Sequence, residues 1–360
     1  MIRLKNALRN FDRKRRDKMA VLEPVLYHVL KNEKNRESGL LKKEVVKSIL
    51  IIRNNKRIGN MYFLIPFVKQ MRVNYPDAHI TLMLNQPWQR DVFSNMGIDD
   101  FVFSYFSTRG MYSFVRSMRE LRKKAYDLVV LPYSSVEDTM ICSMLSAKNK
   151  VATFNPRRNA AFTHTFKKDD ERMHAALSSL YLIPLMGNEL SLPICHHLEW
   201  TQQELDDGVV AKQNLYQGSK LCIAYFRGAR GNKCLSDAAW LSILNKFEND
   251  SNDNIEWVEI LSPDITAPLK DGTLTFRSND MRHLASCLKN MDAFICCDTG
   301  PLHLADAAGV HCIGLFNKTN PTVFGVLGEH SINVENIVYL DVRDILRNVG
   351  LSRVLNESDY

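Results

Sequence analysis

Residues 298–309 read DTGPLHLADAAG and directly follow the apolar run AFICC at 293–297. The apolar run predicts a buried strand. Thr299 or Gly300 can cap a helix whose first position is Pro301, because the N–H that proline lacks would be unpaired there anyway. The segment therefore predicts a strand, a tight turn and then a short helix.

Gly309 is a typical helix stop, so the helix is short and its start is a candidate phosphate site. A helix N-terminus after a strand presents free N–H groups and the positive end of the helix dipole, and both favour an anion. His303 falls in the first turn, and we expect it to point toward the same place. Ordinary strand–helix junctions of α/β proteins look alike, so the residues by themselves leave both interpretations open.

This segment resembles the signature of glycosyltransferase family 9, the bacterial lipopolysaccharide heptosyltransferases. The resemblance is carried by Asp298, Thr299, Gly300, His303, Ala305, Ala307 and Ala308. The following run, CIGLFNKTNP at 312–321, is similar to the family's next strand and its Gly-Pro-Thr-x-Pro loop. Thr319 and Pro321 are kept there, whereas Asn317 and Lys318 replace the usual Gly-Pro. In the family this half of the chain holds the ADP-sugar donor.

A second loop also favours donor binding. Arg227 to Lys233 reads RGARGNK after a predicted strand; small residues such as Gly228 let the backbone approach an anion, and Lys233 supplies a point charge. The loop lacks P-loop spacing. It resembles the family loop whose lysine contacts the donor phosphates, although Leu235 and Ser236 stand where the family has proline and tryptophan. A solvated basic loop is the alternative interpretation.

The segment Arg57-Ile58-Gly59-Asn60 resembles the family's N-terminal motif, in which the residue after the glycine is an aspartate proposed as the catalytic base. An amide cannot take that proton, and losing a positioned base costs roughly 10²–10⁴-fold in rate. Three possibilities stay open. Glu137 or Asp138 serves as the base, although either could simply cap a helix; Asn60 orients the acceptor while water takes the proton; or the chain is a weak or inactive homologue.

Length and composition indicate two domains of ordinary globular type. The 360 residues are 45% hydrophobic and 24% charged. No run of 18 apolar residues occurs, and the charged N-terminus lacks the apolar core of a secretory signal. Eight scattered cysteines form no Cys-x-x-Cys pair, so we expect a reduced, cytoplasmic setting. Cys195-His196-His197 has no second ligand cluster, so we expect a surface loop there and no metal.

The basic charge lies in the N-terminal extension. Residues 1–47 hold 14 Lys/Arg against 6 Asp/Glu, whereas the whole chain has a net charge of +7. Apolar residues at helical spacing over 1–30 predict a basic amphipathic helix that Pro24 breaks or kinks. This helix would suit an anionic membrane surface or, equally well, an apolar groove of the body that it would cover. Nucleic acid is a weaker option, because no nucleic-acid motif accompanies the charge. Residues 31–44 predict a polar linker.

The rest of the chain alternates strands and helices, which predicts an α/β fold with parallel sheets. Two doubly wound, Rossmann-like domains facing a cleft form the GT-B architecture. The predicted strands are 45–52, 80–84, 101–103, 128–131, 150–154, 221–226, 257–261, 293–297 and 312–316. The predicted helices are 61–74, 87–96, 110–124, 136–147, 171–186, 237–247, 280–290 and 341–349, the last packing back across the domain junction.

These elements divide the chain into five parts, two of which take their roles from the resemblance. They are the basic extension 1–44, an acceptor-binding domain 45–187, a linker 188–218, a nucleotide-sugar domain 219–340, and a C-terminal helix and tail 341–360. Family acceptors are rich in carboxylate and phosphate, which arginine forks suit. We expect Arg57, Gly59 and Arg109, beside predicted strand ends, to bind the acceptor.

The resemblance implies an inverting transferase that moves heptose from ADP-heptose to the lipopolysaccharide inner core. Asp298, Thr299, Gly300, His303, Thr319, Gly228 and Lys233 would hold the donor. No Asp-x-Asp metal motif is visible, so we expect no cofactor, with the helix end and Lys233 in place of a metal ion. We expect His303 to be neutral, since a helix N-terminus disfavours imidazolium. Residues 1–44 would dock the enzyme at the cytoplasmic face of the inner membrane.

Asn60 also supports a different class of protein. In this alternative the chain is a catalytically weak nucleotide-sugar or carbohydrate-binding homologue at the membrane. An oxidoreductase is disfavoured, because no Gly-x-Gly-x-x-Gly follows a predicted strand.

Overall fold

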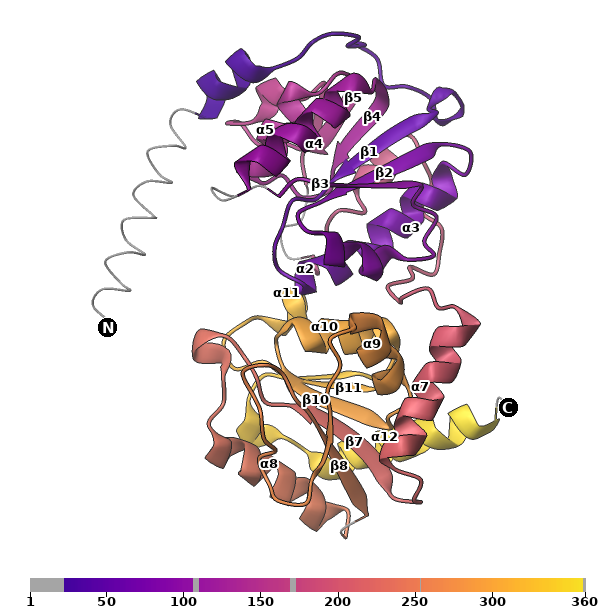
Figure 1. Ribbon diagram of the computed structural model, residues 1–360, viewed down its shortest axis with the longest axis vertical. Coiled ribbons are helices and arrows are strands. Elements are labelled where there is room, and N and C mark those ends of the chain that lie inside the picture. Colours follow the sequence, from indigo (N-terminus) through magenta and orange to yellow (C-terminus); the bar gives the residue numbers. More distant parts are fainter. Residues whose placement is uncertain (1–22, 106–109, 169–172, 253, 359–360) are drawn as a thin grey trace, which may run out of the picture.

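The computed structural model describes residues 23–105, 110–168, 173–252 and 254–358. These residues form two domains, each built on one six-stranded parallel sheet with helices on both faces (Figure 1). The predicted GT-B architecture, with two Rossmann-like domains, is therefore confirmed.

The first sheet lies in the N-terminal domain. Its strands are β1 (Ser48–Ile52), β2 (His79–Leu84), β3 (Asp100–Phe103), β4 (Tyr126–Leu131), β5 (Ala147–Thr153) and β6 (His164–Phe166). Their order in the sheet is β3-β2-β1-β4-β5-β6. The helices are η1 (Lys43–Val45), α2 (Gly59–Tyr62), α3 (Ile65–Asn74), η2 (Pro87–Phe93), α4 (Met111–Lys123), α5 (Val136–Met144), η3 (Asn159–Ala161) and α6 (Leu182–Leu185).

The second sheet repeats this topology with the order β12-β11-β10-β7-β8-β9. Its strands are β7 (Leu221–Phe226), β8 (Ile255–Ile260), β9 (Leu274–Phe276), β10 (Ala293–Cys297), β11 (Cys312–Leu315) and β12 (Ile332–Val334). The helices are α7 (Gln202–Leu215), η4 (Gly231–Lys233), α8 (Asp237–Asp250), α9 (Met281–Lys289), α10 (Gly300–Ala308), α11 (Pro321–Phe324), η5 (Ile337–Tyr339) and α12 (Val342–Ser358).

Each sheet has one point at which the strand order reverses. It lies between β1 and β4 in the first sheet and between β7 and β10 in the second. Doubly wound sheets bind ligands at the carboxyl ends of the strands beside this point. A ligand site is therefore expected in the loops that follow these four strands.

Several expected helices differ in the structure. The helix expected over 171–186 is replaced, in its described part, by turns and the short α6, because this backbone contacts the other domain: the N–H of Ala175 donates to the carbonyl of Val323 at 2.8 Å. The region expected to be a linker contains α7. Its sequence lacks an apolar stripe because only Gly208 and Ala211 of this helix are buried.

The part of the C-terminal helix whose side chains the structure describes packs on its own domain, not across the domain junction as expected. Leu340, Val342, Ile345 and Val349 instead lie in a buried cluster with Trp240 and other residues of α8. The apolar side of α12 thus completes the core of its own domain. Within the described residues, no helix is long and apolar enough to cross a membrane.

The described end of the N-terminal extension docks on the first domain. Residues 23–30 are helical, and fully buried Tyr27 belongs to the core beneath α4 and α5. Glu23 forms an ion pair of 3.1 Å with Arg158. The segment expected to be a linker is held to the sheet, for example by the N–H of Glu37, which donates to the carbonyl of Lys148 at 3.0 Å. For these residues the structure favours the docking alternative; the expected helix over 1–22 lies outside the described residues.

We predict that Tyr27→Ala lowers the free energy of unfolding by about 3 kcal/mol, because it deletes a fully buried aromatic side chain. The matched control is Val29→Ala on the same helix, where the side chain is 76% exposed and the change should stay within about 0.5 kcal/mol. Urea denaturation of both variants measures the difference. Equal stability of the two variants would show that the extension is not docked in solution.

Candidate functional site

Asp298 is the centre of a polar cluster directly after β10. Its carboxylate accepts a hydrogen bond from the hydroxyl of Thr319 at 2.6 Å and lies 3.2 Å from Nε2 of His303. Nζ of Lys233 forms an ion pair with the same carboxylate and lies 3.3 Å from the carbonyl oxygen of Asp298. The structure thus brings together four residues that the sequence predicted from three separate loops.

These contacts keep Asp298 ionised although it is only 6% exposed. Burial by itself raises the pKa of a carboxyl group, but the hydrogen bonds from His303, Lys233 and Thr319 hold the pKa of Asp298 well below its usual range. An ionised aspartate repels a phosphate. We therefore expect Asp298 to fix the turn and aim Lys233, while the lysine and the start of α10 face the anion.

The start of α10 has the expected form. Thr299 is the N-cap residue in an extended conformation, Pro301 stands in the first turn, and Gly309 ends the helix at φ 85°. The hydroxyl of Thr299 donates back to the carbonyl of Cys297 at 3.1 Å and does not cap the helix. No side chain therefore caps the first turn of α10. The N–H of Leu302 bonds to the carbonyl of Thr299 at 3.2 Å, and the N–H of Gly300 is available to an anion.

His303 is almost completely buried, which leaves little of its ring accessible to a ligand. It is 5% exposed, its Nε2 faces Asp298, and its Nδ1 is buried without a hydrogen-bond partner among the described residues. Phe63 covers the ring, with the ring centroids 4.5 Å apart. This geometry favours a role in positioning Asp298 over direct contact with the leaving group.

The loop after β7, which the sequence predicts to bind the donor, contacts Asp298 through Lys233. Lys233, in the short helix η4, keeps 31% of its side chain exposed. A Cβ atom added at Gly228 would lie 2.4 Å from Cζ of Phe226, so a larger residue there would require the Phe226 ring to shift. Arg227 is paired within its own domain: its Nε donates to the buried Glu259 at 2.6 Å, and its Nη1 donates to Asp237 at 3.1 Å.

Two glycines allow the domains to touch at this site. A Cβ atom added at Gly59, the first residue of α2, would lie 2.8 Å from Cδ2 of His303. One added at Gly300 would lie 2.1 Å from Cγ2 of Ile58. The N-termini of α2 and α10 therefore meet almost backbone to backbone, as Figure 1 shows where the two domains face each other.

The acceptor-side candidates are less concentrated. Asn60, in the first turn of α2, is partly exposed, and its side chain has no hydrogen-bond partner among the described residues. Arg57 is exposed in the loop before α2. Arg109 lies outside the described residues.

The two candidate carboxylates after β4 differ in access. Glu137 is exposed, whereas Asp138 is fully buried and accepts the N–H of Asn54 at 2.7 Å. Neither caps α5 as the structural alternative expected, because Ser135 is the N-cap and its hydroxyl accepts the N–H of Asp138 at 3.0 Å. Burial raises the pKa of Asp138 to about 6, although the nearby Arg53 partly offsets this.

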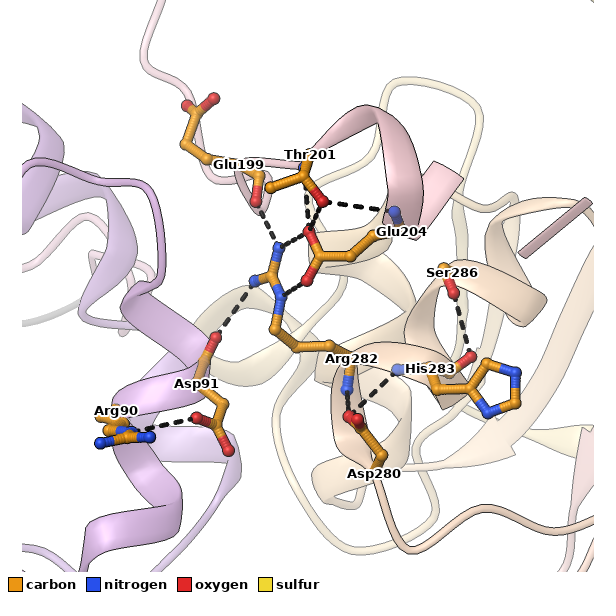
Figure 2. A network of polar contacts seen from close by, with 9 residues as sticks. All are labelled: Arg90, Asp91, Glu199, Thr201, Glu204, Asp280, Arg282, His283 and Ser286. Atoms are coloured by element: carbon orange, nitrogen blue, oxygen red, sulfur yellow. Dashed lines mark hydrogen bonds and ion pairs between the residues drawn. The ribbon is translucent and has the colours of Figure 1, made fainter. Parts of the chain in front are cut away.

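Arg282, which sequence reasoning missed, joins the domains at a second place (Figure 2). This residue of α9 is 8% exposed, forms an ion pair with Glu204 at the start of α7, and stacks 5.0 Å from the Trp200 ring. Its Nη1 donates to the carbonyl of Asp91 in the first domain at 3.1 Å. Only the Thr201–Glu204 capping box was a local signal here, since an arginine in a helix looks like a surface residue.

Comparisons with known proteins agree with this geometry. Residues 278–342, from the turn before α9 to the start of α12, match the model of glycosyltransferase family 9 (heptosyltransferase). No curated protein sequence matches the chain. The resemblance that the motif after β10 predicts is thus confirmed for the segment that contains Asp298 and His303.

Solved structures share the whole fold at low sequence identity. A glycosyl transferase family 9 protein from Veillonella parvula is 16% identical with a TM-score of 0.71, covering 87% of this chain and 91% of that chain. The E. coli heptosyltransferase WaaC with ADP is 14% identical (TM-score 0.63; 84% and 99% covered). E. coli ADP-heptose lps heptosyltransferase II is 15% identical (TM-score 0.64; 86% and 99% covered). The family match and the fold together support a glycosyltransferase.

We predict that Gly300→Ala lowers the free energy of unfolding by about 1–3 kcal/mol, because the new methyl group meets Ile58. Adding Ile58→Ala in the same chain removes the clashing atom and should restore part of the loss. Gly39→Ala is the control, since a Cβ atom there meets nothing within 4 Å. Denaturant unfolding of the three variants would refute the domain contact if Gly300→Ala were as stable as Gly39→Ala.

Proposed function

We propose that the protein is an inverting glycosyltransferase that moves heptose from ADP-heptose to the inner core of lipopolysaccharide, either lipid A–Kdo or a core heptose. The observation that carries this proposal is the meeting of two N-termini. The start of α10, with Lys233 beside it, offers an anion site in the second domain, and Gly59 and Asn60 of the first domain lie directly against it.

In this scheme the donor diphosphate binds the N–H groups at the start of α10. Lys233 turns from Asp298 toward the phosphate oxygens, which gives a charge-assisted contact worth about 1.5–3 kcal/mol. Thr319 and His303 keep Asp298 in place when the lysine moves. The positive end of the helix then stabilises the negative charge that develops on ADP as it leaves.

The transfer itself is a displacement at the anomeric carbon. The acceptor hydroxyl oxygen forms the new C–O bond, the bond to the phosphate oxygen breaks, and ADP departs with that electron pair. Asn60, partly exposed at the start of α2, orients the acceptor hydroxyl through its amide. The hydroxyl proton passes to water or to Glu137, because Asp138 is fully buried and already accepts a backbone N–H.

The E. coli enzyme WaaC has been solved with ADP and with ADP-2-deoxy-2-fluoro heptose, and this supports an ADP-sugar as the donor. The protein works in the cytoplasm, at the membrane that holds the lipid acceptor. The second candidate function is a catalytically weak nucleotide-sugar-binding homologue, and Asn60 in the place of an acidic residue favours it.

We predict acceptor-dependent release of ADP from ADP-heptose by the wild type, measured with purified lipopolysaccharide core acceptors. Lys233→Ala should lower kcat/KM by about 10- to 100-fold, because it removes the charge-assisted phosphate contact. Lys220→Ala, at the opposite end of β7, is the control and should retain full activity. A loss of acceptor-dependent ADP release in Glu137→Gln would identify Glu137 as the catalytic base.

The competing outcomes are distinct. ADP-heptose binding without turnover on any core acceptor would favour the binding homologue. Activity gained in Asn60→Asp would then show that the missing carboxylate at this position is why the wild type does not turn over. Turnover that is equal in Lys233→Ala and Lys220→Ala would refute the proposed donor site.

A further inference from the structure

Arg53 directly follows β1 and lies at the strand-order reversal of the first sheet. The residue is 7% exposed, and its guanidinium stacks on Tyr133, with Cζ 4.2 Å from the ring centroid. Tyr133 comes two residues after β4, the neighbour of β1 at this reversal. The stacked pair therefore occupies the position at which doubly wound sheets bind ligands.

The guanidinium of Arg53 has no hydrogen-bond acceptor among the residues that the structure describes. Its Nε is buried and unpaired, whereas its two terminal nitrogens form no hydrogen bond with a described residue and keep some contact with solvent. Burial lowers the pKa of this side chain; the carboxylate of Asp138 partly compensates but does not come within salt-bridge distance. A largely buried cation with an unpaired Nε–H is costly, and the terminal N–H groups remain open to an acceptor.

The polar groups around Arg53 are otherwise well paired. The side-chain oxygen of Asn54 accepts the hydroxyl of Ser104 at 2.6 Å, and Gln89 donates to the carbonyl of Asn55 at 2.6 Å. Unpaired buried atoms lie on the Arg53 side: Oδ2 of Asp138, and the hydroxyl of Ser134 next to Tyr133. The network is thus incomplete around the guanidinium, where a ligand would supply the acceptors.

We propose that Arg53, held flat by Tyr133, binds an oxyanion, and, resting on the proposed function, that this oxyanion is a carboxylate or phosphate of the acceptor. The planar fork of arginine matches both groups with two parallel hydrogen bonds. The hydroxyl of Tyr133 lies 3.0 Å from the carbonyl oxygen of Phe63, directly after α2. An anion on Arg53 is therefore anchored beside the helix that carries Asn60, and it sets the acceptor hydroxyl against α10.

Isothermal titration calorimetry of the full chain tests this proposal with three probes: the methyl glycoside of Kdo, its carboxyl methyl ester, and inorganic phosphate. We expect the wild type to bind the acid or phosphate about 10- to 100-fold more tightly than the neutral ester. Arg53→Met should abolish that preference. Arg122→Met, which removes an exposed cation from α4, should keep it. Phosphate binding without Kdo binding would assign the site to a phosphate group.

Thermal unfolding separates this role from a structural one. Arg53→Met should unfold no lower than the wild type, because it removes a buried cation that lacks partners. If Arg53→Met fails to fold, Arg53→Lys is the second variant. It keeps the positive charge without the planar guanidinium, and its preference for the acid over the ester should be about tenfold smaller than that of the wild type. An equal affinity of the wild type for acid and ester, or an unchanged preference in Arg53→Met or Arg53→Lys, would overturn the proposal. Anion selectivity without ADP-heptose turnover would contradict the proposed reaction and leave the anion site standing.

Discussion

The close approach of α2 and α10 is the constraint on which the rest of the structure depends. Both helices begin with glycine, and a Cβ atom on either would overlap the other domain. Because the helices meet end to end, a continuous buried cluster runs from Met61 and Tyr62 to Leu302 and Leu304 across the junction. The same approach brings Gly59 and Asn60, the proposed acceptor side, against the proposed anion site at α10, so domain packing also assembles the proposed site.

Charge within the site is arranged around Asp298. A carboxylate beside a phosphate is unfavourable by itself, yet next to the proposed phosphate site Asp298 holds Lys233, Thr319 and the ring of His303 in one place. The lysine can exchange this carboxylate for a phosphate without becoming unpaired. On the other side of the contact, the Nε of Arg53 is buried and has no acceptor among the residues that the structure describes. The two proposed anion-binding cations thus differ. Lys233 of the second domain forms an ion pair with Asp298, whereas Arg53 of the first domain forms no hydrogen bond with a described residue.

Local signals made much of this predictable from the sequence. The strand β10, the N-cap Thr299 and the stop at Gly309 follow from neighbouring residues, and the resemblance to a family identified Lys233 and Thr319. The missed features depend on tertiary contacts. Helix α7 has almost no buried face of its own. Arg282 and Arg53 look like surface cations in sequence, because burial is a property of the folded chain.

A crystal structure of the protein with ADP tests the central claim most directly. The account predicts that the diphosphate contacts the N–H groups at the start of α10, that Nζ of Lys233 has moved from Asp298 to a phosphate oxygen, and that Thr319 and His303 still hold the carboxylate. ADP bound elsewhere, or bound with the Lys233–Asp298 ion pair intact and no phosphate at α10, would contradict it.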